Sequence, residues 1–133
     1  MKKRIIQSFT LLIGLMMLYS FGRGTQDPWE VPAKYDKMEN PVTADKESIA
    51  LGKSLYNKHC KSCHGKEGLG DGPKADELDT PSGDFTSDEF KSQSDGALFY
   101  KSLEGRDDMP TYKKKIPDEE DMWSVVNYLR TLE

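Results

Sequence analysis

The sequence predicts an all-α fold with about three main helices joined by long loops. Three stretches, residues 43–60, 95–103 and 117–132, place apolar residues at the three- and four-residue spacing of an amphipathic helix. No stretch alternates apolar and polar residues as a half-buried strand does, and the chain has no internal repeat. The connecting loops are long for a domain of roughly 90 residues. We therefore expect something other than secondary structure to hold these loops in place.

The first 22 residues have the pattern of a secretory signal peptide. Lys2, Lys3 and Arg4 form a positive segment, an apolar run follows over residues 9–19, and residues 20–22 resemble a small-residue cleavage site. The apolar run is well short of the roughly 20 residues that span a bilayer. We expect this segment to be cleaved and the protein to be exported to the periplasm. An uncleaved N-terminal anchor is the alternative.

Residues 23–44 are expected to form an extended leader, and residues 45–133 the folded domain. Pro28, Pro32 and Pro41 punctuate the leader, which shows neither a helical nor an alternating pattern. A tether that spaces the domain from its point of exit is the simplest interpretation of this composition.

The charge balance bears on the choice of partner. The formal net charge is −4, and loss of the signal segment, with its three basic and no acidic residues, takes it to −7. An acidic protein is a poor ligand for nucleic acid or for anionic lipid. We therefore expect no nucleic-acid partner.

The first helix is expected to begin at Thr43, whose hydroxyl can cap it. Acidic residues at 45 and 47 then lie in the first turn, where negative charge suits the helix dipole. The apolar face consists of Ile49, Gly52, Leu55, Tyr56 and His59. Gly52 costs such a helix about 1 kcal/mol relative to alanine. A glycine at this position therefore indicates the close approach of another backbone.

Capping residues define the other two helices. The second is predicted from a cap at Ser94 or Asp95 to a stop at Gly105. The third is predicted to open at Pro117 and to continue with four acidic residues at 118–121. Its apolar face consists of Met122, Val125, Val126, Leu129 and Leu132.

The segment between the first two helices is expected to be a loop. Glycines and prolines interrupt it repeatedly from residue 65 to 83, with room for a short helix over residues 74–78. Phe85 and Phe90 are interpreted as aromatic anchors in loop structure. The sequence gives no role for residues 79–94.

The stretch YNKHCKSCHGKEGLGDGP, residues 56–73, contains both cysteines and both histidines of the chain. These are Cys60 and Cys63, and His59 and His64. A thioredoxin-type dithiol is disfavoured because no strand precedes the motif. A structural zinc site normally needs two separated pairs of ligands, and the second pair does not exist. A disulfide across so short a loop would constrain little of the unfolded chain.

The spacing Cys-x-x-Cys-His is instead the signature of a covalently attached, c-type haem. Two cysteines three apart at the end of a helix can reach two vinyl groups of a porphyrin as thioethers. The adjacent histidine then presents its imidazole to iron. A haem would also give the long loops an apolar centre, in a domain near the lower size limit for a self-sufficient core. We predict one covalent haem c held by Cys60 and Cys63, with His64 as an iron ligand.

The second axial position requires another ligand. His59 directly precedes Cys60 on the same helix and cannot easily reach the opposite face of the haem. Met38 lies in the leader and Met122 on the core face of the last helix, where methionine is an ordinary filler. Met109 is an apolar residue in a polar loop, just before a proline, and thioether ligation would account for it. We predict that Met109 is the second ligand.

Three stretches together, residues 56–73, Met109-Pro110 and the closing WSVVNYLRTL, resemble class I cytochrome c. The similarity is greatest to small bacterial periplasmic members and extends over about residues 45–133. It implies the cytochrome c fold, in which long loops wrap around one covalently bound haem. It also implies that the cysteines hold the haem and that His64 and Met109 ligate iron.

Further residues match the family by position. Gly52 and Tyr56 correspond to the packing positions of the first helix, and Val125 and Tyr128 to the surface of the last helix that crosses it. Pro73 corresponds to the proline whose carbonyl accepts a hydrogen bond from the proximal histidine. Independently of the resemblance, Arg106 lies three residues before Met109 and is a candidate partner for a haem propionate.

The expected function is that of a mobile, monomeric electron carrier and not an enzyme, with a redox protein as donor and another as acceptor. Lysines at 58, 61 and 66 and at 113–115 could form a basic rim around the haem edge, or could simply be solvated. A haem-binding subunit of a larger membrane-associated oxidoreductase complex is one alternative. A haem enzyme or gas sensor with an open iron position is another.

Overall fold

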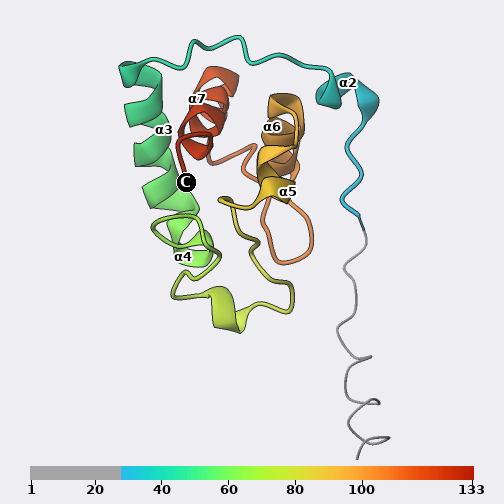
Figure 1. The fold of residues 1–133 in the computed structure, drawn as a ribbon, viewed down its shortest axis with the longest axis vertical. Coiled ribbons are helices and arrows are strands. Elements are labelled where there is room, and N and C mark those ends of the chain that lie inside the picture. The colour runs from blue at the N-terminus through green and yellow to red at the C-terminus, as the bar shows by residue number, and fades with distance from the viewer. Residues whose placement is uncertain (1–27) are drawn as a thin grey trace, which may run out of the picture.

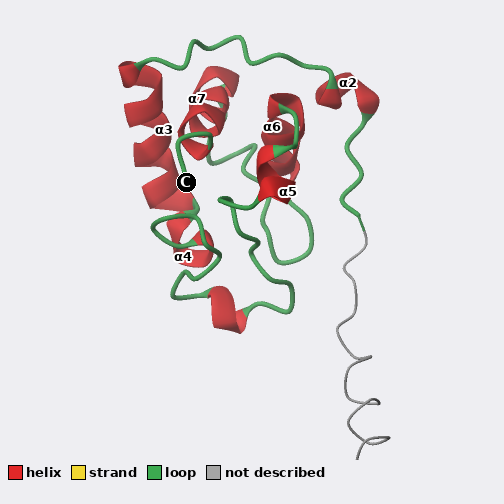
Figure 2. Cartoon of the chain, viewed as in Figure 1, coloured by secondary structure: helices red, strands yellow, loops and turns green. Residues whose placement is uncertain are grey.

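The computed structural model describes residues 28–133, and the named elements in that range are helices. The three longest are α3 (Lys46–His59), α6 (Asp95–Glu104) and α7 (Glu119–Leu129), as Figures 1 and 2 show. Shorter turns are α2 (Ala33–Asp36), α4 (Lys61–His64), the 3-10 turn η2 (Ala75–Glu77) and α5 (Asp88–Lys91). The predicted all-α fold with three main helices is confirmed. The predicted signal peptide lies outside the described residues.

α3 and α7, from opposite ends of the domain sequence, lie side by side (Figure 1). A Cβ atom at Gly52 would overlap the backbone carbonyl of Ser124, so only glycine allows the two helices to approach this closely. The rings of Tyr56 and Tyr128 meet at the same crossing, with centroids 5.2 Å apart. The close approach predicted from Gly52 is therefore present, and its partner is α7.

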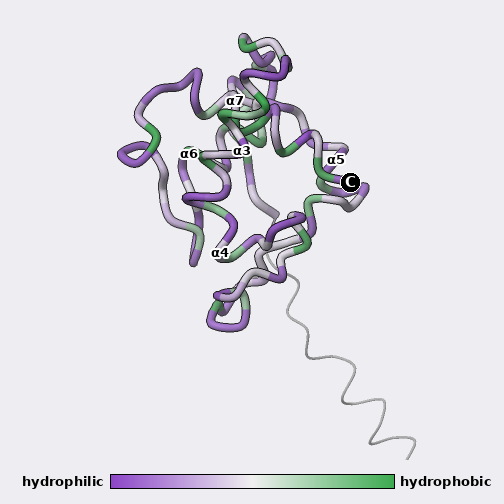
Figure 3. The backbone as a smooth tube through the Cα atoms, turned by 90° about the vertical axis from the view of Figure 1, so that its left-hand side faces the viewer, coloured by the Kyte–Doolittle hydropathy of each residue, from purple (hydrophilic) through white to green (hydrophobic). Residues whose placement is uncertain are grey.

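The hydrophobic core is centred on α7. Met122, Trp123 and Val126 are buried, and the Trp123 indole stacks on the Phe99 ring of α6 with centroids 4.1 Å apart. Along the backbone, apolar stretches alternate with polar ones, and several gather around α7 (Figure 3). The core therefore joins α7 to both other long helices, and it includes the loop residues Tyr112 and Ile116.

The helix starts follow the capping rules, with two corrections. One is that α7 begins at Glu119, after its cap, and not at the predicted Pro117. Asp45, not Thr43, caps α3, and its carboxylate accepts a hydrogen bond from the Ser48 backbone N–H at 2.9 Å. Ser94 caps α6 as predicted, and Asp118, directly after Pro117, caps α7. Aspartate accepts this bond as well as threonine does and adds a negative charge at the positive helix end.

The leader is not simply extended, because residues 33–36 form the one-turn helix α2. This turn packs on α6, where the rings of Tyr35 and Tyr100 lie 4.7 Å apart. Further along, Asn40 donates a hydrogen bond to Asn127 of α7 at 2.8 Å. The described part of the leader therefore belongs to the folded domain. None of the helices in residues 28–133 is long and apolar enough to cross a membrane.

Candidate haem site

One helical turn presents the two cysteines and the histidine of the motif. Cys60 ends α3 and begins α4, which continues to His64. The backbone N–H groups of Cys63 and His64 both donate to the Cys60 carbonyl, at 3.1 and 3.0 Å. Both cysteines are free thiols and half-buried. The local fold therefore supplies two thiols and an imidazole from one five-residue segment, residues 60–64.

The imidazole of His64 is buried and aromatic rings surround it. The Phe85 ring stacks on it with centroids 4.5 Å apart, and the Phe90 ring stacks on Phe85 at the same distance. Burial lowers the pKa of His64 to about 4, so the ring is neutral at pH 7 and keeps a lone pair available. Its Nδ1 atom is buried without a hydrogen-bond partner among residues 28–133, whereas a backbone hydrogen bond with Ser82 opposes the effect of burial and raises the pKa of the ring. A neutral, desolvated imidazole suits ligation of a metal.

The glycine-rich loop folds back onto the motif. The Tyr56 hydroxyl, buried in α3, donates to the Gly65 carbonyl at 2.8 Å. The backbone N–H groups of Gly72 and Lys74 donate to the carbonyls of Cys63 and Ser62, at 3.1 and 2.8 Å. Backbone bonds therefore fix this loop against α4.

Pro73 lies between the two bonded residues of that loop, so it is held next to the motif. Its side chain is exposed, and no hydrogen bond joins it to His64 in the described chain. The predicted bond between the Pro73 carbonyl and the histidine stays a prediction for the haem-bound protein.

Met109 lies on a tight turn that reaches the same core cluster as Cys60. Both side chains are half-buried and pack against that cluster. Tyr112, three residues later, donates its hydroxyl to the His59 carbonyl at 2.7 Å, tying this loop to the end of α3. Burial, together with the nearby Cys60 and Cys63 thiols, raises the Tyr112 pKa to about 12. The structure therefore brings the Met109 loop and the cysteine turn to one region of the molecule.

Arg106 adjoins Met109 but is engaged with other groups. Its guanidinium lies over the Trp29 ring, 4.7 Å from the centroid, and its Nε atom is 3.2 Å from an Asp107 carboxylate oxygen. Pairing with a haem propionate stays a prediction.

The remaining ligand candidates lie in other surroundings. The His59 ring meets Tyr112 edge-on, at 5.9 Å between centroids, and its buried Nε2 has no hydrogen-bond partner within the described range. This partly buried ring agrees with the predicted place of His59 on the apolar face of the helix. Met122 is 1% exposed in the core, whereas Met38 is 36% exposed on the leader. Both methionines match their predicted settings.

Residues 79–94, without a role from sequence, contact both sides of the site. Phe85 covers His64 and Phe90 stacks on Phe85, and Phe90 lies in α5 and not in the predicted loop structure. The backbone N–H of Thr80 donates to an Asp108 carboxylate oxygen at 3.0 Å, next to Met109. The aromatic residues were visible in the sequence as anchors, but no spacing rule indicated that they pack on the histidine.

These surroundings fit a c-type haem. Two unpaired thiols lie on the same turn as a neutral, buried imidazole, and a thioether packs on the same core. Burial raises the Cys60 pKa to about 12, so this thiol stays protonated and is not a preformed thiolate site for a free metal ion. The donor set therefore suits thioether attachment.

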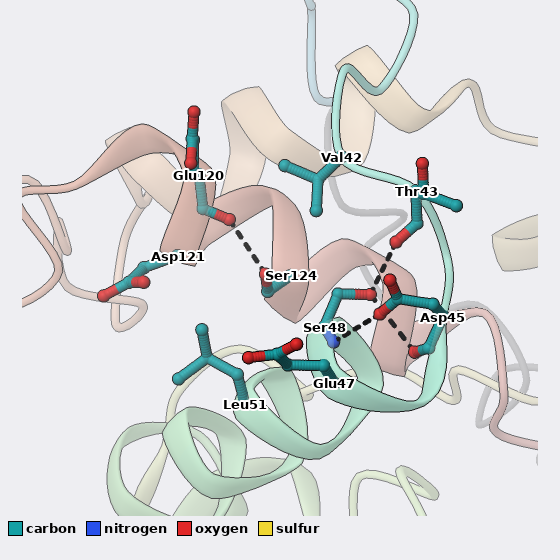
Figure 4. A pocket seen from close by; sticks show the side chains of 9 residues that line it. All are labelled: Val42, Thr43, Asp45, Glu47, Ser48, Leu51, Glu120, Asp121 and Ser124. Carbon is teal, nitrogen blue, oxygen red and sulfur yellow. Dashed lines mark hydrogen bonds between the residues drawn. The ribbon is translucent and has the colours of Figure 1, made fainter.

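A pocket elsewhere has a different character (Figure 4). It lies between the N-terminal ends of α3 and α7, and its lining includes the carboxylates of Asp45, Glu47, Glu120 and Asp121. Acidic side chains in the first turn are favoured by the helix dipole, which accounts for their number here. The lining contains no cysteine, histidine or methionine.

Comparisons with known proteins agree with this site. Residues 49–133 match the family model for cytochrome c. Over 38 residues the chain is 45% identical to the quinohemoprotein alcohol dehydrogenase ADH IIB of Pseudomonas putida, a match covering 29% of this chain and 6% of that protein. A solved chain of the Kuenenia stuttgartiensis reducing HAO-like protein complex superposes with a TM-score of 0.63 and 26% identity. That match covers 82% of this chain and 52% of the other. This chain belongs to the cytochrome c family and binds haem c covalently.

Proposed function

We propose that this protein is a single-haem electron carrier of the periplasm. Cys60 and Cys63 form the thioethers, and His64 and Met109 ligate the iron. The observation that supports this most directly is that Cys60 and Met109, 49 residues apart, pack against one core cluster. The family match adds electron transport as the general activity.

The chain's own residues would restrict the site to electron transfer. The bound haem supplies an iron that cycles between two oxidation states. His64 donates a neutral nitrogen, and the Met109 thioether favours the reduced state and so raises the potential. If His64 and Met109 both ligate the iron, these side chains would leave no open position for a substrate. Phe85, stacked on His64, would exclude water from that ligand, which lowers the reorganisation that accompanies each electron.

Replacing Met109 tests the ligand assignment. Met109→Ala in the holoprotein should abolish the weak red-end charge-transfer band of Met-ligated ferric haem, lower the reduction potential and allow rapid carbon monoxide binding to the reduced protein. Met38→Ala is the matched control, because that methionine is exposed on the leader. If the unmodified protein already binds carbon monoxide rapidly and the Met109 variant has an unchanged spectrum, an open-iron enzyme or sensor is the correct class.

Export is the second part of this proposal. Residues 1–22 would direct secretion and be removed, which would place haem attachment outside the cytoplasm. Intact mass of the purified protein, together with a pyridine haemochrome spectrum, would report the cleavage site and one thioether haem. A mass that retains residues 1–22 would instead support a membrane anchor.

A second candidate function is that of a cytochrome subunit within a larger complex. The two similar proteins are a quinohemoprotein dehydrogenase and a component of a protein complex, and this chain spans only part of each. The tightly packed leader would suit a fixed subunit as well as a mobile carrier. Native size-exclusion chromatography of a cell extract separates the two, since a carrier elutes as a monomer.

A further inference from the structure

The side chain of Trp29 lies against two cations of the folded domain. The Arg106 guanidinium carbon is 4.7 Å from the ring centroid, and the Lys101 ammonium is 5.5 Å from it. The ring is half-buried and forms one wall of a groove that Tyr100 and Gly105 also line. A cation over an indole face is attracted by the negative face of the ring. Trp29 is therefore held by the end of α6 and by the turn that follows it.

That turn carries Met109. The backbone N–H of Arg106 donates to the Met109 carbonyl, and the Met109 N–H donates to the Arg106 carbonyl, each at 2.9 Å. Gly105 precedes this pair with φ at +70°, and a Cβ there would overlap the Met109 carbonyl. Because the two residues are bonded in both directions, a displacement of Arg106 displaces the backbone of Met109.

The rest of the leader gives Trp29 a fixed position. Ser94 donates its hydroxyl to an Asp36 carboxylate oxygen at 2.7 Å, and the Tyr35 ring packs on Tyr100. Residues 28–44 therefore form an ordered strap along α6 and across the ends of α7 and α3 (Figure 1). The cytochrome c match begins at residue 49, so this strap lies outside the family core.

We propose that Trp29 is a positioning residue for the second iron ligand. It holds the turn of residues 105–110 through Arg106 and so keeps Met109 in its ligating position. The inference rests on the proposed function, because it assumes that Met109 binds the iron. Without the indole, the turn loses its contact with the leader, and the population with Met109 detached increases.

Imidazole competition measures that population directly. In the full-length ferric holoprotein, Trp29→Ala should raise the apparent affinity for added imidazole by about threefold to tenfold, the range that loss of one or two exposed cation–ring contacts gives. Trp29→Phe keeps an aromatic ring, so its imidazole affinity should lie between those of Trp29→Ala and the unmodified protein. The red-end charge-transfer band should vanish at a lower temperature in Trp29→Ala, while the midpoint of the helical signal changes little.

Tyr35→Ala is the matched control, since it removes another aromatic contact of the strap that does not touch the turn. It should leave the imidazole affinity unchanged. Equal affinities of Trp29→Ala and the unmodified protein, alongside a large increase in Met109→Ala, would overturn the positioning role and leave the ligand assignment intact. No change in either variant would overturn both.

Discussion

At the scale of single residues, the hydroxyl of Tyr56 stabilises the turn that carries the haem-attachment motif. It is fully buried and donates to the carbonyl of Gly65, the residue after His64. Tyr56→Phe removes the donor and leaves that carbonyl without its partner. We expect a loss of about 1–2 kcal/mol in the free energy of unfolding of the holoprotein. Urea unfolding followed by far-ultraviolet circular dichroism measures it.

Tyr128→Phe provides the comparison for that experiment. Tyr128 packs on Tyr56, but its hydroxyl donates no hydrogen bond among residues 28–133. Removal of the Tyr128 hydroxyl should lower the free energy of unfolding clearly less than removal of the Tyr56 hydroxyl does. If both substitutions lower the free energy of unfolding equally, the hydrogen bond from Tyr56 to Gly65 does not stabilise the turn.

The residues of the site differ in how far sequence could identify them. Cys60, Cys63 and His64 were predictable because covalent attachment needs them at a fixed local spacing. The prediction of Met109 as a ligand required elimination among distant methionines. Phe85 and Tyr112 reach the site only through tertiary packing, which no short-range pattern encodes. The aromatic cover of the histidine therefore had to come from the structure.

At the scale of elements, the crossing of α3 and α7 depends on one missing side chain. Gly52→Ala would gain helix propensity of about 1 kcal/mol. The added Cβ would nevertheless overlap the Ser124 carbonyl, which is backbone and cannot rotate away. Overpacking costs about 1–3 kcal/mol, so we expect a net loss of stability of up to about 2 kcal/mol. A thermal melt of the holoprotein should show a lower midpoint.

Ser54→Ala is the control on the exposed side of the same helix. It also raises helix propensity but meets no neighbouring helix, and it should leave the midpoint unchanged or slightly higher. A Gly52→Ala protein as stable as this control would show that the crossing can widen at little cost.

The elements also show which helices could be predicted from the sequence and which could not. The three long helices were predicted within a few residues because each has a cap and a continuous apolar face. α2 and α5 are single turns, and helices this short are not stable alone. α2 exists because Tyr35 packs on Tyr100, and α5 because Ser87 caps it and Phe90 packs inward. Such turns are products of tertiary structure.

At the scale of the whole molecule, local and net charge oppose each other. Lysines 58, 61 and 66 flank the haem motif, although the exported protein would be strongly acidic. Lys66 is paired with Glu67 at 3.1 Å, whereas Lys61 is exposed on α4 and makes no ion pair in the described chain. The sign of the salt effect on the electron-transfer rate shows whether the local or the net charge controls docking.

The rate of electron transfer to a small anionic iron complex, measured at several salt concentrations, gives the sign of this effect. If the lysine rim attracts the anion, added salt should slow the reaction, because screening acts within about 10 Å at 0.1 M salt. If the net negative charge dominates, salt should accelerate it. Lys61→Gln should weaken the slowing, while Lys46→Gln, at the far end of α3, should not. Stopped-flow rates over a salt series would decide between them.

The pairing of α3 with α7 also has a consequence for biogenesis. The attachment motif directly follows α3, but the helix that covers α3 is the last element of the chain. A polypeptide made and threaded from its N-terminus thus exposes Cys60, Cys63 and His64 before α7 exists. During that interval the thiols lie on an unfinished domain, open to the machinery that joins them to haem. If attachment takes place in that interval, α7 would close the fold around a cofactor that is already in place.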